Sequence, residues 1–437
     1  MKISKLHIDQ FRHLENLDFD FTYPEDFHIE EKRGKPLDKI CFIGQSATGK
    51  TGLLELINEQ IMCALHISLL NGNTNSASVF SEYLPALNGE IELLFDDTTF
   101  NRKNEKFFYN NKAYIIERQS GYGTQLIPTK EEKIIYLKAN LISDKNIDIF
   151  TKNPIDLIEI YRKGNEVNIE NLLDKSFNRS NFVFNDNVDP KIWLFLLSEI
   201  LEYRKNFTQR ISELIHIKNG NADLSNLGSE IQKWQKENPN KVEIFAQKFN
   251  PLLEKLYLEV DIVNTEYPIP LKNKKTNEII GLENTSTGTK GLLLSFLPIY
   301  KLEAKDSIIL IDEPERSLYP DIQMDLMDQY KRLAPEAQFI VATHSPFIAA
   351  SFEPDERFIL YFDEDGKVAV RRGSSPIGDD PNDILKNDFG VNYYNKHGEE
   401  AYQKYIKLKQ EVANETDPKR KKELLLETVK LGDTYNF

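Results

Sequence analysis

The stretch that decides this fold is Gly44-Gln45-Ser46-Ala47-Thr48-Gly49-Lys50-Thr51. The apolar run Ile40–Ile43 precedes it, and the apolar-periodic run Leu53–Ile57 follows it. Strand, glycine-bounded loop and helix in this order are the context in which G-x-x-x-x-G-K-[ST] forms a phosphate-binding P-loop. The flanking elements therefore favour a P-loop over a chance match in a glycine-containing turn.

The residue types of the loop suit this chemistry. Gly44 and Gly49 allow the backbone to approach phosphate closely. Lys50 is expected to reach the β- and γ-phosphates of a nucleoside triphosphate, and the Thr51 hydroxyl is expected to ligate Mg²⁺. Backbone amides of the loop and of the helix start complete such a site. The loop residues expected to supply these amides include Gln45, Ser46, Ala47 and Thr48.

Composition narrows the class of protein. The 437 residues carry 69 acidic and 55 basic side chains, a net charge of −14, so nucleic-acid binding would need a local basic patch. Cys41 and Cys63 lie in apolar surroundings without metal-type spacing, which favours a reducing cytoplasm. The N-terminus lacks a signal-type apolar core, and no apolar run reaches the ~18 residues of a membrane span. We expect a cytoplasmic protein without membrane contact.

The coarse pattern predicts an α/β chain. Residues 1–22 read as two strands with Arg12 between them, which is either part of an edge hairpin or a side chain facing the nucleotide. A helix is expected over 50–70 and an antiparallel β patch over 88–138. The stretch 150–257 has helical periodicity, with breaks at two prolines.

Two buried strands in the last third end in polar residues. Ser307–Glu313 ends in Asp312 and Glu313, and Gln338–His344 ends in threonine and histidine. Near-continuous apolar runs are typical of parallel strands covered on both faces, and ligands gather at the carboxyl ends of such strands.

These polar residues suit ATP chemistry. We expect the Asp312 strand to lie beside the P-loop strand, with Asp312 joining Thr51 on Mg²⁺. Glu313 is then placed to deprotonate an attacking water, and His344 to contact the γ-phosphate or that water. The alternatives are ordinary solvated acids and a satisfied histidine.

Asn284–Leu294 brings hydroxyls and a glycine, Ser286, Thr287 and Gly288, to the start of an apolar-periodic helix. Alone, this pattern indicates only a capped helix, although such a start also suits phosphate. The basic runs Lys272–Lys275 and Lys419–Lys422 read as solvated surfaces, with phosphate contact as the alternative.

Taken together, these motifs resemble the ABC-type ATPases, and within them the RecF/SMC/OLD-like branch. The residues that carry the resemblance are Phe11-Arg12, Gly44–Thr51, Ser286–Gly288, Ile308–Glu313 with Pro314-Glu315 and Leu318–Pro320, and Ala342–Pro346. The resemblance is specific over about 1–65 and 280–362. Only 93 residues follow His344 and they lack a TOPRIM-like acidic cluster, so the chain looks like a stand-alone ATPase. The tail Asn382–Val391 resembles, more loosely, PtuA-like ATPases that act in bacterial antiphage systems beside a separate nuclease.

The resemblance implies a head domain that dimerises head-to-tail around two ATP molecules, each with Mg²⁺. Ser286 and Gly288 of one subunit would complete the γ-phosphate site of the other. Glu313 would be the catalytic base, His344 the γ-phosphate sensor and Arg12 a nucleotide contact. The loop Ser317–Pro320 would cross the dimer interface.

Two positions depart from the family pattern. The signature reads Thr285-Ser286-Thr287-Gly288-Thr289 rather than Leu-Ser-Gly-Gly-Gln, so one glycine is missing. No glutamine stands where the Q-loop is expected, near Leu137–Asn140, and Asn140 is the substitute candidate.

The expected fold is an α/β P-loop NTPase head of ABC type, with a mixed sheet, an antiparallel β subdomain, a helical insertion and a helical tail. The expected divisions are 1–149, 150–257, 258–380 and 381–437. The leading hypothesis is an ATP-driven homodimeric switch of prokaryotic defence that controls an effector nuclease or toxin. A DNA-binding RecF-like repair ATPase is the alternative. A transporter subunit is disfavoured because 234 residues separate Thr51 from Ser286 without a recognisable Q-loop.

Overall fold

The computed structural model describes most of the chain. The described residues are 1–70, 76–78, 85–95, 98–117, 123–127, 133–163, 181–218, 227–302, 304, 306–378, 380–391 and 396–435.

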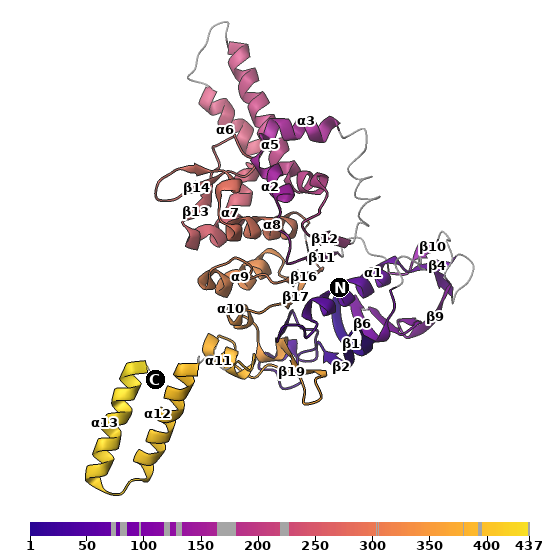
Figure 1. Ribbon diagram of the computed structural model, residues 1–437. Coiled ribbons are helices and arrows are strands. Elements are labelled where there is room, and N and C mark those ends of the chain that lie inside the picture. Colours follow the sequence, from indigo (N-terminus) through magenta and orange to yellow (C-terminus); the bar gives the residue numbers. More distant parts are fainter. Residues whose placement is uncertain are drawn as a thin grey trace.

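A seven-stranded sheet lies at the centre of the molecule (Figure 1). Its neighbours run parallel except for the final antiparallel pair, β18 and β19. In spatial order the strands are β12 (Asn181–Phe184), β11 (Ile134–Leu137), β16 (Ile308–Asp312), β17 (Gln338–Ala342), β3 (Lys39–Gly44), β18 (Arg357–Phe362) and β19 (Val368–Arg372). Every residue of β16 and β17 is buried, as predicted for parallel strands covered on both faces.

The position predicted for the Asp312 strand is wrong. β17 separates β16 from β3, and the register pairs Asp312 with Ala342 and Ala342 with Phe42. Two apolar strands of similar length and composition cannot be ordered within a parallel sheet from their sequences alone. The helix after the P-loop, α1 (Lys50–His66), contacts both β17 and β16 and so bridges the extra strand.

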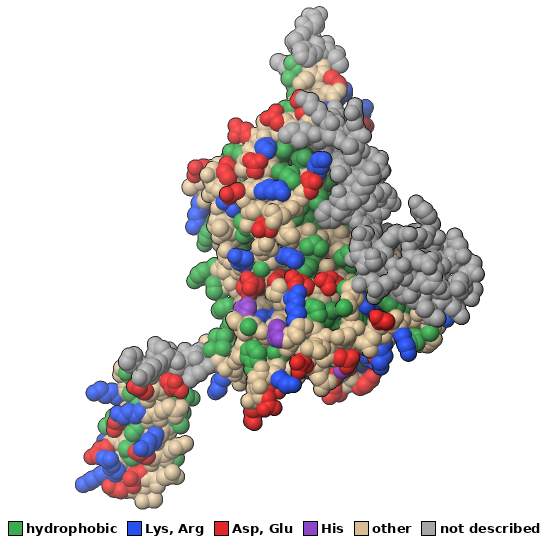
Figure 2. Space-filling view, turned by 45° about the vertical axis from the view of Figure 1, so that its right-hand side comes forward, with side chains coloured by type: hydrophobic (Ala, Val, Ile, Leu, Met, Phe, Trp, Pro, Cys, Tyr) green, Lys and Arg blue, Asp and Glu red, His purple; other side chains and the backbone are tan. Residues whose placement is uncertain are grey.

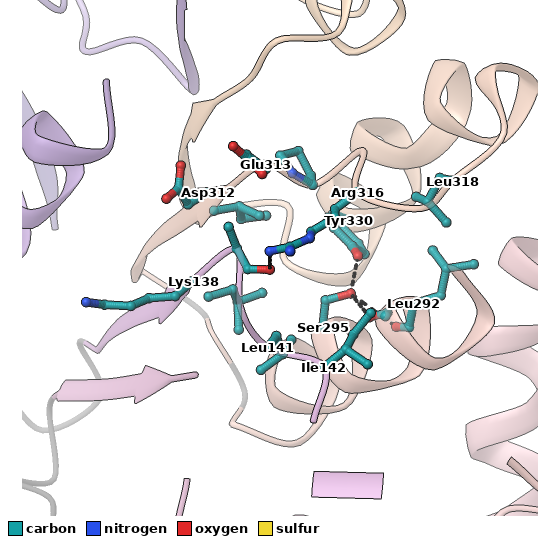
Figure 3. A pocket seen from close by; sticks show the side chains of 15 residues that line it. Lys138, Leu141, Ile142, Leu292, Ser295, Asp312, Glu313, Arg316, Leu318 and Tyr330 are labelled. Atoms are coloured by element: carbon teal, nitrogen blue, oxygen red, sulfur yellow. Dashed lines mark hydrogen bonds between the residues drawn. The ribbon is translucent and has the colours of Figure 1, made fainter. Parts of the chain in front are cut away.

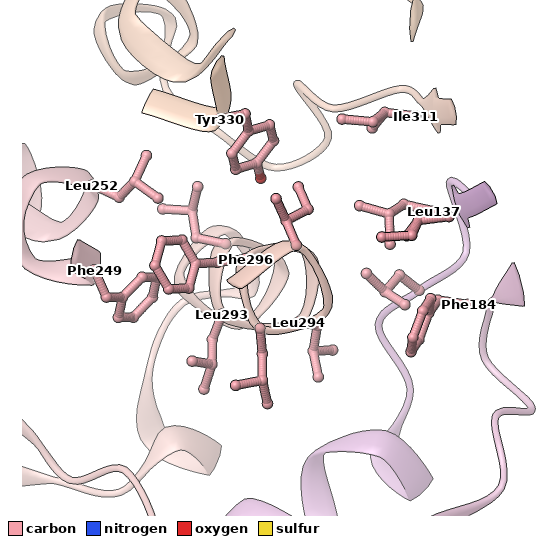
Figure 4. Packing of buried hydrophobic residues seen from close by; sticks show 14 of the residues in the cluster. Leu137, Phe184, Phe249, Leu252, Leu293, Leu294, Phe296, Ile311 and Tyr330 are labelled. Carbon is pink, nitrogen blue, oxygen red and sulfur yellow. The ribbon is translucent and has the colours of Figure 1, made fainter. Parts of the chain in front are cut away.

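The central sheet divides the interior into two cores. Alternate β3 residues face opposite sides, so that Cys41 and Ile43 join one core while Ile40 and Phe42 join the other. One side is covered by α1 and by a second sheet. The other side is covered by α8 (Thr287–Lys301), α9 (Pro320–Leu333), α7 (Lys241–Leu253) and α5 (Pro190–Lys218). Figure 4 shows α8 in this second core, with Phe296 turned toward Phe249 and Leu252 of α7.

In the described residues the second sheet has nine strands and is mainly antiparallel, as predicted for most of the stretch 88–138. The prediction is wrong for Ile134–Leu137, which forms β11 and pairs in parallel with β12 and β16 in the central sheet. Along β6 every second residue is buried, which shows that one face of the sheet packs inward. In spatial order the strands are β10 (Gly123–Gln125), β4 (Ser68–Leu70), β5 (Ser76–Ser78), β9 (Lys112–Glu117), β8 (Lys106–Tyr109), β7 (Thr98–Lys103), β6 (Asn88–Phe95), β1 (Lys2–Phe11) and β2 (Leu14–Asp20). α1 ends at His66 rather than near residue 70, because Ile67 is extended and β4 follows.

The stretch predicted as helical contains helices and one strand. α5 and α6 (Leu227–Glu237) project from the head, with α2 (Asp144–Thr151) and α3 (Pro154–Lys163) at their base (Figure 1). The strand is β12, an aromatic and β-branched run that pairs with β11 at the edge of the central sheet. A small sheet of β13 (Leu258–Val260), β14 (Leu271–Asn273) and β15 (Ile279–Ile280) follows α7.

The tail is helical, as predicted. α11 (Pro381–Asn387) is fixed to the head by Asp388, which pairs with Arg357 at 3.1 Å while both side chains are fully buried. α12 (Lys396–Asn414) and α13 (Pro418–Tyr435) pack on each other as a hairpin that projects from the head (Figure 1). The remaining short helix of the head is α10 (Pro346–Ala349).

Both cysteines are buried and free, which agrees with the sequence prediction. Within the described part of the chain, every helix is too short or too polar to cross a bilayer.

Candidate phosphate-binding and hydrolysis site

The P-loop follows β3 directly and requires both of its glycines. Gly44 has φ +140°, and a Cβ there would lie 1.9 Å from the Leu360 carbonyl oxygen of β18. Gly49 has φ +90°, and a Cβ there would lie 2.9 Å from Cδ2 of Leu14. Ala47 also adopts a left-handed conformation, with φ 66°. The loop therefore has the tight, inward-turned backbone that a phosphate cradle needs.

Lys50 is folded onto its own loop. Its Nζ donates hydrogen bonds to the carbonyl oxygens of Gly44 at 2.9 Å and Gln45 at 2.8 Å, and the residue is 6% exposed. Burial lowers the pKa of Lys50 to about 8, although nearby acids, Asp312 first, oppose that shift. An anionic phosphate in the loop would restore the preference for the ammonium form.

Thr51, in the first turn of α1, is hydrogen-bonded to Asp312, the last residue of β16. The Thr51 hydroxyl donates to the two carboxylate oxygens of Asp312 at 3.0 and 3.2 Å. Burial raises the pKa of Asp312 to about 6, more than the hydrogen bond from Thr51 lowers it. Mg²⁺ prefers oxygen ligands and is commonly held by one or two protein groups together with phosphate oxygens and waters. The pair of an exposed threonine hydroxyl and a buried carboxylate fits such an ion.

Glu313 and His344 follow β16 and β17 at the same edge. Glu313 has φ 52°, and its N–H still donates to the Ala342 carbonyl at 2.9 Å, so the chain turns sharply while paired to β17. Partial burial and the charge of Lys50 lower the pKa of His344, while Glu313 opposes that shift. The electrostatic influence of Lys50 and Glu313 on His344 indicates that the predicted residues gather at one site.

Glu315 is a site residue that was noted in sequence only as part of the family motif. Its carboxylate accepts hydrogen bonds from the Thr343 hydroxyl at 2.7 Å and from the backbone N–H of His344 at 2.8 Å. Burial raises its pKa, against the effect of these two hydrogen bonds. Glu315 thus ties the turn after β16 to the turn that presents His344. Its position three residues after Asp312 was the available signal.

The predicted signature starts α8. Ser286 is the N-cap: its Oγ accepts from the Thr289 N–H at 3.1 Å and lies 2.9 Å from the Thr289 hydroxyl. A Cβ at Gly288 would lie 2.5 Å from the carbonyl oxygen of Ser317. Among the described residues, no hydrogen bond or ion pair joins Ser286–Gly288 to Gly44–Thr51. Within the described part of one chain, Ser286, Thr287 and Gly288 are therefore not bonded to the P-loop.

A small cavity lies between the Glu313 turn and α8. Its volume is about 40 Å³, enough for about one water. Figure 3 shows Asp312 and Glu313 at one end and Leu292 and Ser295 of α8 at the other. Across it, Arg316 Nη1 donates to the Ala139 carbonyl at 2.8 Å. This bond joins the turn after Glu313 to the segment expected to hold the Q-loop.

Arg12 belongs to the turn between β1 and β2, and its side chain lies beside the start of α1. Its Nη2 donates to Glu55 Oε2 at 2.8 Å, and a Cβ at Gly52 would lie 3.2 Å from its Nη1. Lys138 approaches the same Glu55 at 3.5 Å. Arg12 is thus part of the hairpin and also close to the P-loop helix, so the two interpretations do not exclude each other. Its contact with nucleotide stays a prediction, as does the role of Asn140, which is exposed.

Comparison with known proteins identifies the family of this chain. Residues 1–349 match the family described as "AAA ATPase domain". A stretch of 72 residues is 36% identical to Septu protein PtuA of Bacillus thuringiensis. That stretch is 16% of this chain and 18% of PtuA, so the match spans less than a fifth of that relative.

Two solved structures are similar over most of the chain. The SMC head domain from Thermotoga maritima is 14% identical, with a TM-score of 0.39, over 86% of this chain and 100% of that one. An SMC head bound to the C-winged helix domain of ScpA is 14% identical, with a TM-score of 0.40, over 86% of this chain and 98% of that one. The family match alone covers four-fifths of the sequence, and this chain belongs to the AAA ATPase domain family.

Proposed function

We propose that this protein binds and hydrolyses ATP as a homodimeric switch and that it controls a separate effector, such as a nuclease or toxin, in antiphage defence. The observation that carries the ATPase part is the convergence of Lys50, the Thr51–Asp312 pair, Glu313 and His344 at one sheet edge. The defence role is supported by the partial match to Septu protein PtuA.

Different residues of this chain bind the nucleotide and carry out the proton transfer. Lys50 and the loop amides bind the β- and γ-phosphates, and Thr51 with Asp312 would hold Mg²⁺. When bound, that ion neutralises charge on the phosphate oxygens. The Glu313 carboxylate accepts a proton from the attacking water as its oxygen bonds to the γ-phosphorus. The bond between the γ-phosphorus and its bridging oxygen breaks, which yields ADP and inorganic phosphate.

Dimerisation would bring a second copy of Ser286–Gly288 to each γ-phosphate. The hydroxyls and amides at the start of α8 suit a phosphate group, but among the described residues they form no hydrogen bond with the P-loop of their own chain. Moving a subunit pair from mostly open to mostly closed requires about 5.5 kcal/mol of bias. Two shared, charge-assisted phosphate contacts are of the right order, and hydrolysis removes them.

A subunit-mixing experiment tests this arrangement. Lys50→Ala and Ser286→Arg should each be inactive alone, because each damages both sites of a symmetric dimer. Mixed one to one, they should regain about a quarter of the parental ATPase rate, because half of the dimers would hold one intact site. No gain on mixing would show that the site does not use a partner's signature. Circular dichroism must first show that both variants fold.

A truncation tests the effector role. Ending the chain after Asp380 would remove Asp388 and leave Arg357 buried without its partner, so the cut belongs after Val391. This variant should hydrolyse ATP at the parental rate but lose a co-expressed effector in a pull-down. Retention of the effector would discard the α12–α13 hairpin as its docking element.

The charge distribution gives the DNA-binding alternative little support. On the face shown in Figure 2, acidic and basic side chains are interspersed rather than gathered into a basic track. Lys272 pairs with Glu259 at 2.8 Å and Arg420 with Glu423 at 3.1 Å, so both basic runs have acidic neighbours. Steeply salt-dependent stimulation of the ATPase by duplex DNA would favour the alternative.

A further inference from the structure

A group of exposed apolar side chains lies on α13, away from the phosphate-binding site. Leu425, Leu426 and Val429 are 51%, 62% and 53% exposed. They lie within about one helical turn of one another, so they form one continuous surface. A contiguous apolar group on an otherwise polar surface indicates contact with another molecule, whereas scattered single residues do not.

The rest of the described chain leaves this surface uncovered. α12 and α13 pack on each other and project from the head (Figure 1). Among their described residues, the buried ones are Ala401 and Leu408 of α12 and Leu424, Thr428 and Gly432 of α13. Helices in proteins are stabilised mainly by the packing of one face, and the interior of this hairpin is small. A further helix on the exposed surface would therefore stabilise it.

The two ends of the apolar surface carry opposite charges. Lys422, Leu426, Val429 and Asp433 follow the spacing i, i+4, i+7 and i+11, so they share one face of α13. Both charged residues are exposed, and neither forms an ion pair among the described residues. We call these four residues, together with Leu425, the α13 strip.

The charges of α13 oppose the dipole of the helix. Basic residues occupy its start, at Lys419–Lys422, and Asp433 lies in its last turn. A helix dipole favours acids at the start and bases at the end. These charges are therefore unfavourable in an isolated helix, and favourable beside a copy of the same helix that runs in the opposite direction.

The α13 strip is complementary to itself when two copies lie antiparallel. In a two-fold contact, residue i of one copy meets residue j of the other, and j meets i. A two-fold axis between residues 427 and 428 places Leu426 against Val429 of the second copy, and Lys422 against its Asp433. Parallel helices would instead place Lys422 against Lys422 and Asp433 against Asp433, and such like charges repel.

We propose that two copies of this chain pair through their α13 strips, with the two helices antiparallel. The apolar residues pack on each other at the centre, and a Lys422–Asp433 ion pair lies at each end. The strip belongs to the projecting hairpin and not to the phosphate-binding site, so this pairing needs no nucleotide (Figure 1). It is distinct from the ATP-dependent contact of the proposed function, and it keeps two copies together when that contact opens.

The mass of the full-length protein without nucleotide tests the pairing. Sedimentation equilibrium should show a monomer–dimer equilibrium with a Kd of about 50 µM or tighter. Lys50→Ala, which lacks the phosphate contact, should give the same Kd. A protein that stays monomeric up to about 200 µM would overturn the proposal.

Charge reversal tests the partner and the orientation together. Lys422→Glu and Asp433→Lys each place like charges at both ends of a homodimer, so each should weaken the pairing at least about tenfold. Mixed one to one, the two variants should pair with the parental Kd, because their heterodimer has opposite charges at both ends. The double variant should also pair as the parent does. A mixture no stronger than the single variants would overturn the proposal.

Lys407→Glu is the matched control. It makes the same charge change on α12, where Lys407 is exposed and outside the α13 strip. Its Kd should match the parent's, and a loss equal to that of Lys422→Glu would assign the effect to net charge and overturn the proposal. All of these hairpin variants should retain ATP hydrolysis, so failure of the pairing and failure of the proposed ATPase would give different results.

Discussion

Lys50 and Arg204 are both buried cations, 6% and 7% exposed, but they are held in different ways. Lys50 is satisfied by two carbonyl groups of its own loop, within six residues of itself. Arg204 has one carbonyl, sixty residues away, and two buried donors without a partner. A phosphate must displace bonds that Lys50 already makes, whereas the two unpaired nitrogens of Arg204 are closed to solvent. A site built from one local backbone turn leaves a motif in the sequence, and a site built from distant side chains does not.

The largest expected effect is at Lys50, the cation of the phosphate loop. Lys50→Ala should abolish ATP binding and hydrolysis, because the loop loses the charge-assisted contact to the β- and γ-phosphates. Thermal unfolding monitored with and without Mg-ATP should show no nucleotide-dependent shift in this variant. A stabilisation by ATP equal to the parent's would remove Lys50 from the site.

Glu313→Gln should lower the hydrolysis rate by about 10²–10⁴-fold, the usual contribution of a general base. The amide has nearly the same shape, so ATP binding should persist and closed dimers should accumulate. Single-turnover hydrolysis and light scattering with ATP measure the two effects. Normal turnover would exclude Glu313 as the base.

Glu315→Gln should have a smaller effect, about a tenfold loss in rate, because one charged hydrogen bond to the His344 turn is weakened. The Kd for ATP should be unchanged, because Glu315 touches the Thr343–His344 turn rather than the P-loop. A tenfold change in Kd with an unchanged rate would contradict this positioning role. Glu353→Gln, at the start of the short helix Pro354–Glu356 that leads into β18, is the matched control.

The smallest expected effect is a change in protein stability at Asp38, a carboxylate separate from the two cations. Burial alone would raise the pKa of Asp38, but hydrogen bonds from Lys2 at 2.6 Å and Lys32 at 2.9 Å outweigh it and hold that pKa below its usual range. The folded pKa lies below the unfolded one, so the stabilisation is present above about pH 4 and is lost as pH falls further. Asp38→Asn should cost about 1.5–3 kcal/mol at pH 7.

Denaturant unfolding at pH 7, 4 and 3 measures this contribution. The difference in unfolding free energy between parent and Asp38→Asn should shrink across the series. A difference that stays constant would show that the contribution of Asp38 does not depend on its charge.

Most of the phosphate-binding site could be predicted from the sequence, because each part of the site lies within one short segment. The P-loop glycines, the apolar strands that end in Asp312 and His344, and the Ser286 cap each occupy one short segment. Features that depend on tertiary structure could not be predicted from the sequence. β17 separates β16 from β3, and β12 is a strand in a stretch of helical period. A cavity of about 530 Å³ brings together α5, α6, α7 and the loop after β13, and no periodicity in the sequence marks its lining.

The close contact between Gly288 and the Ser317 carbonyl has a mechanical consequence. Because even a methyl group at residue 288 would lie 2.5 Å from that oxygen, the start of α8 packs against the turn that follows Glu313 with no room for a side chain between them. The same turn is fastened to residue 139 through Arg316 and to residue 344 through Glu315. A displacement of the start of α8 would therefore also displace the turn that follows Glu313 and, through Glu315, the turn that presents His344.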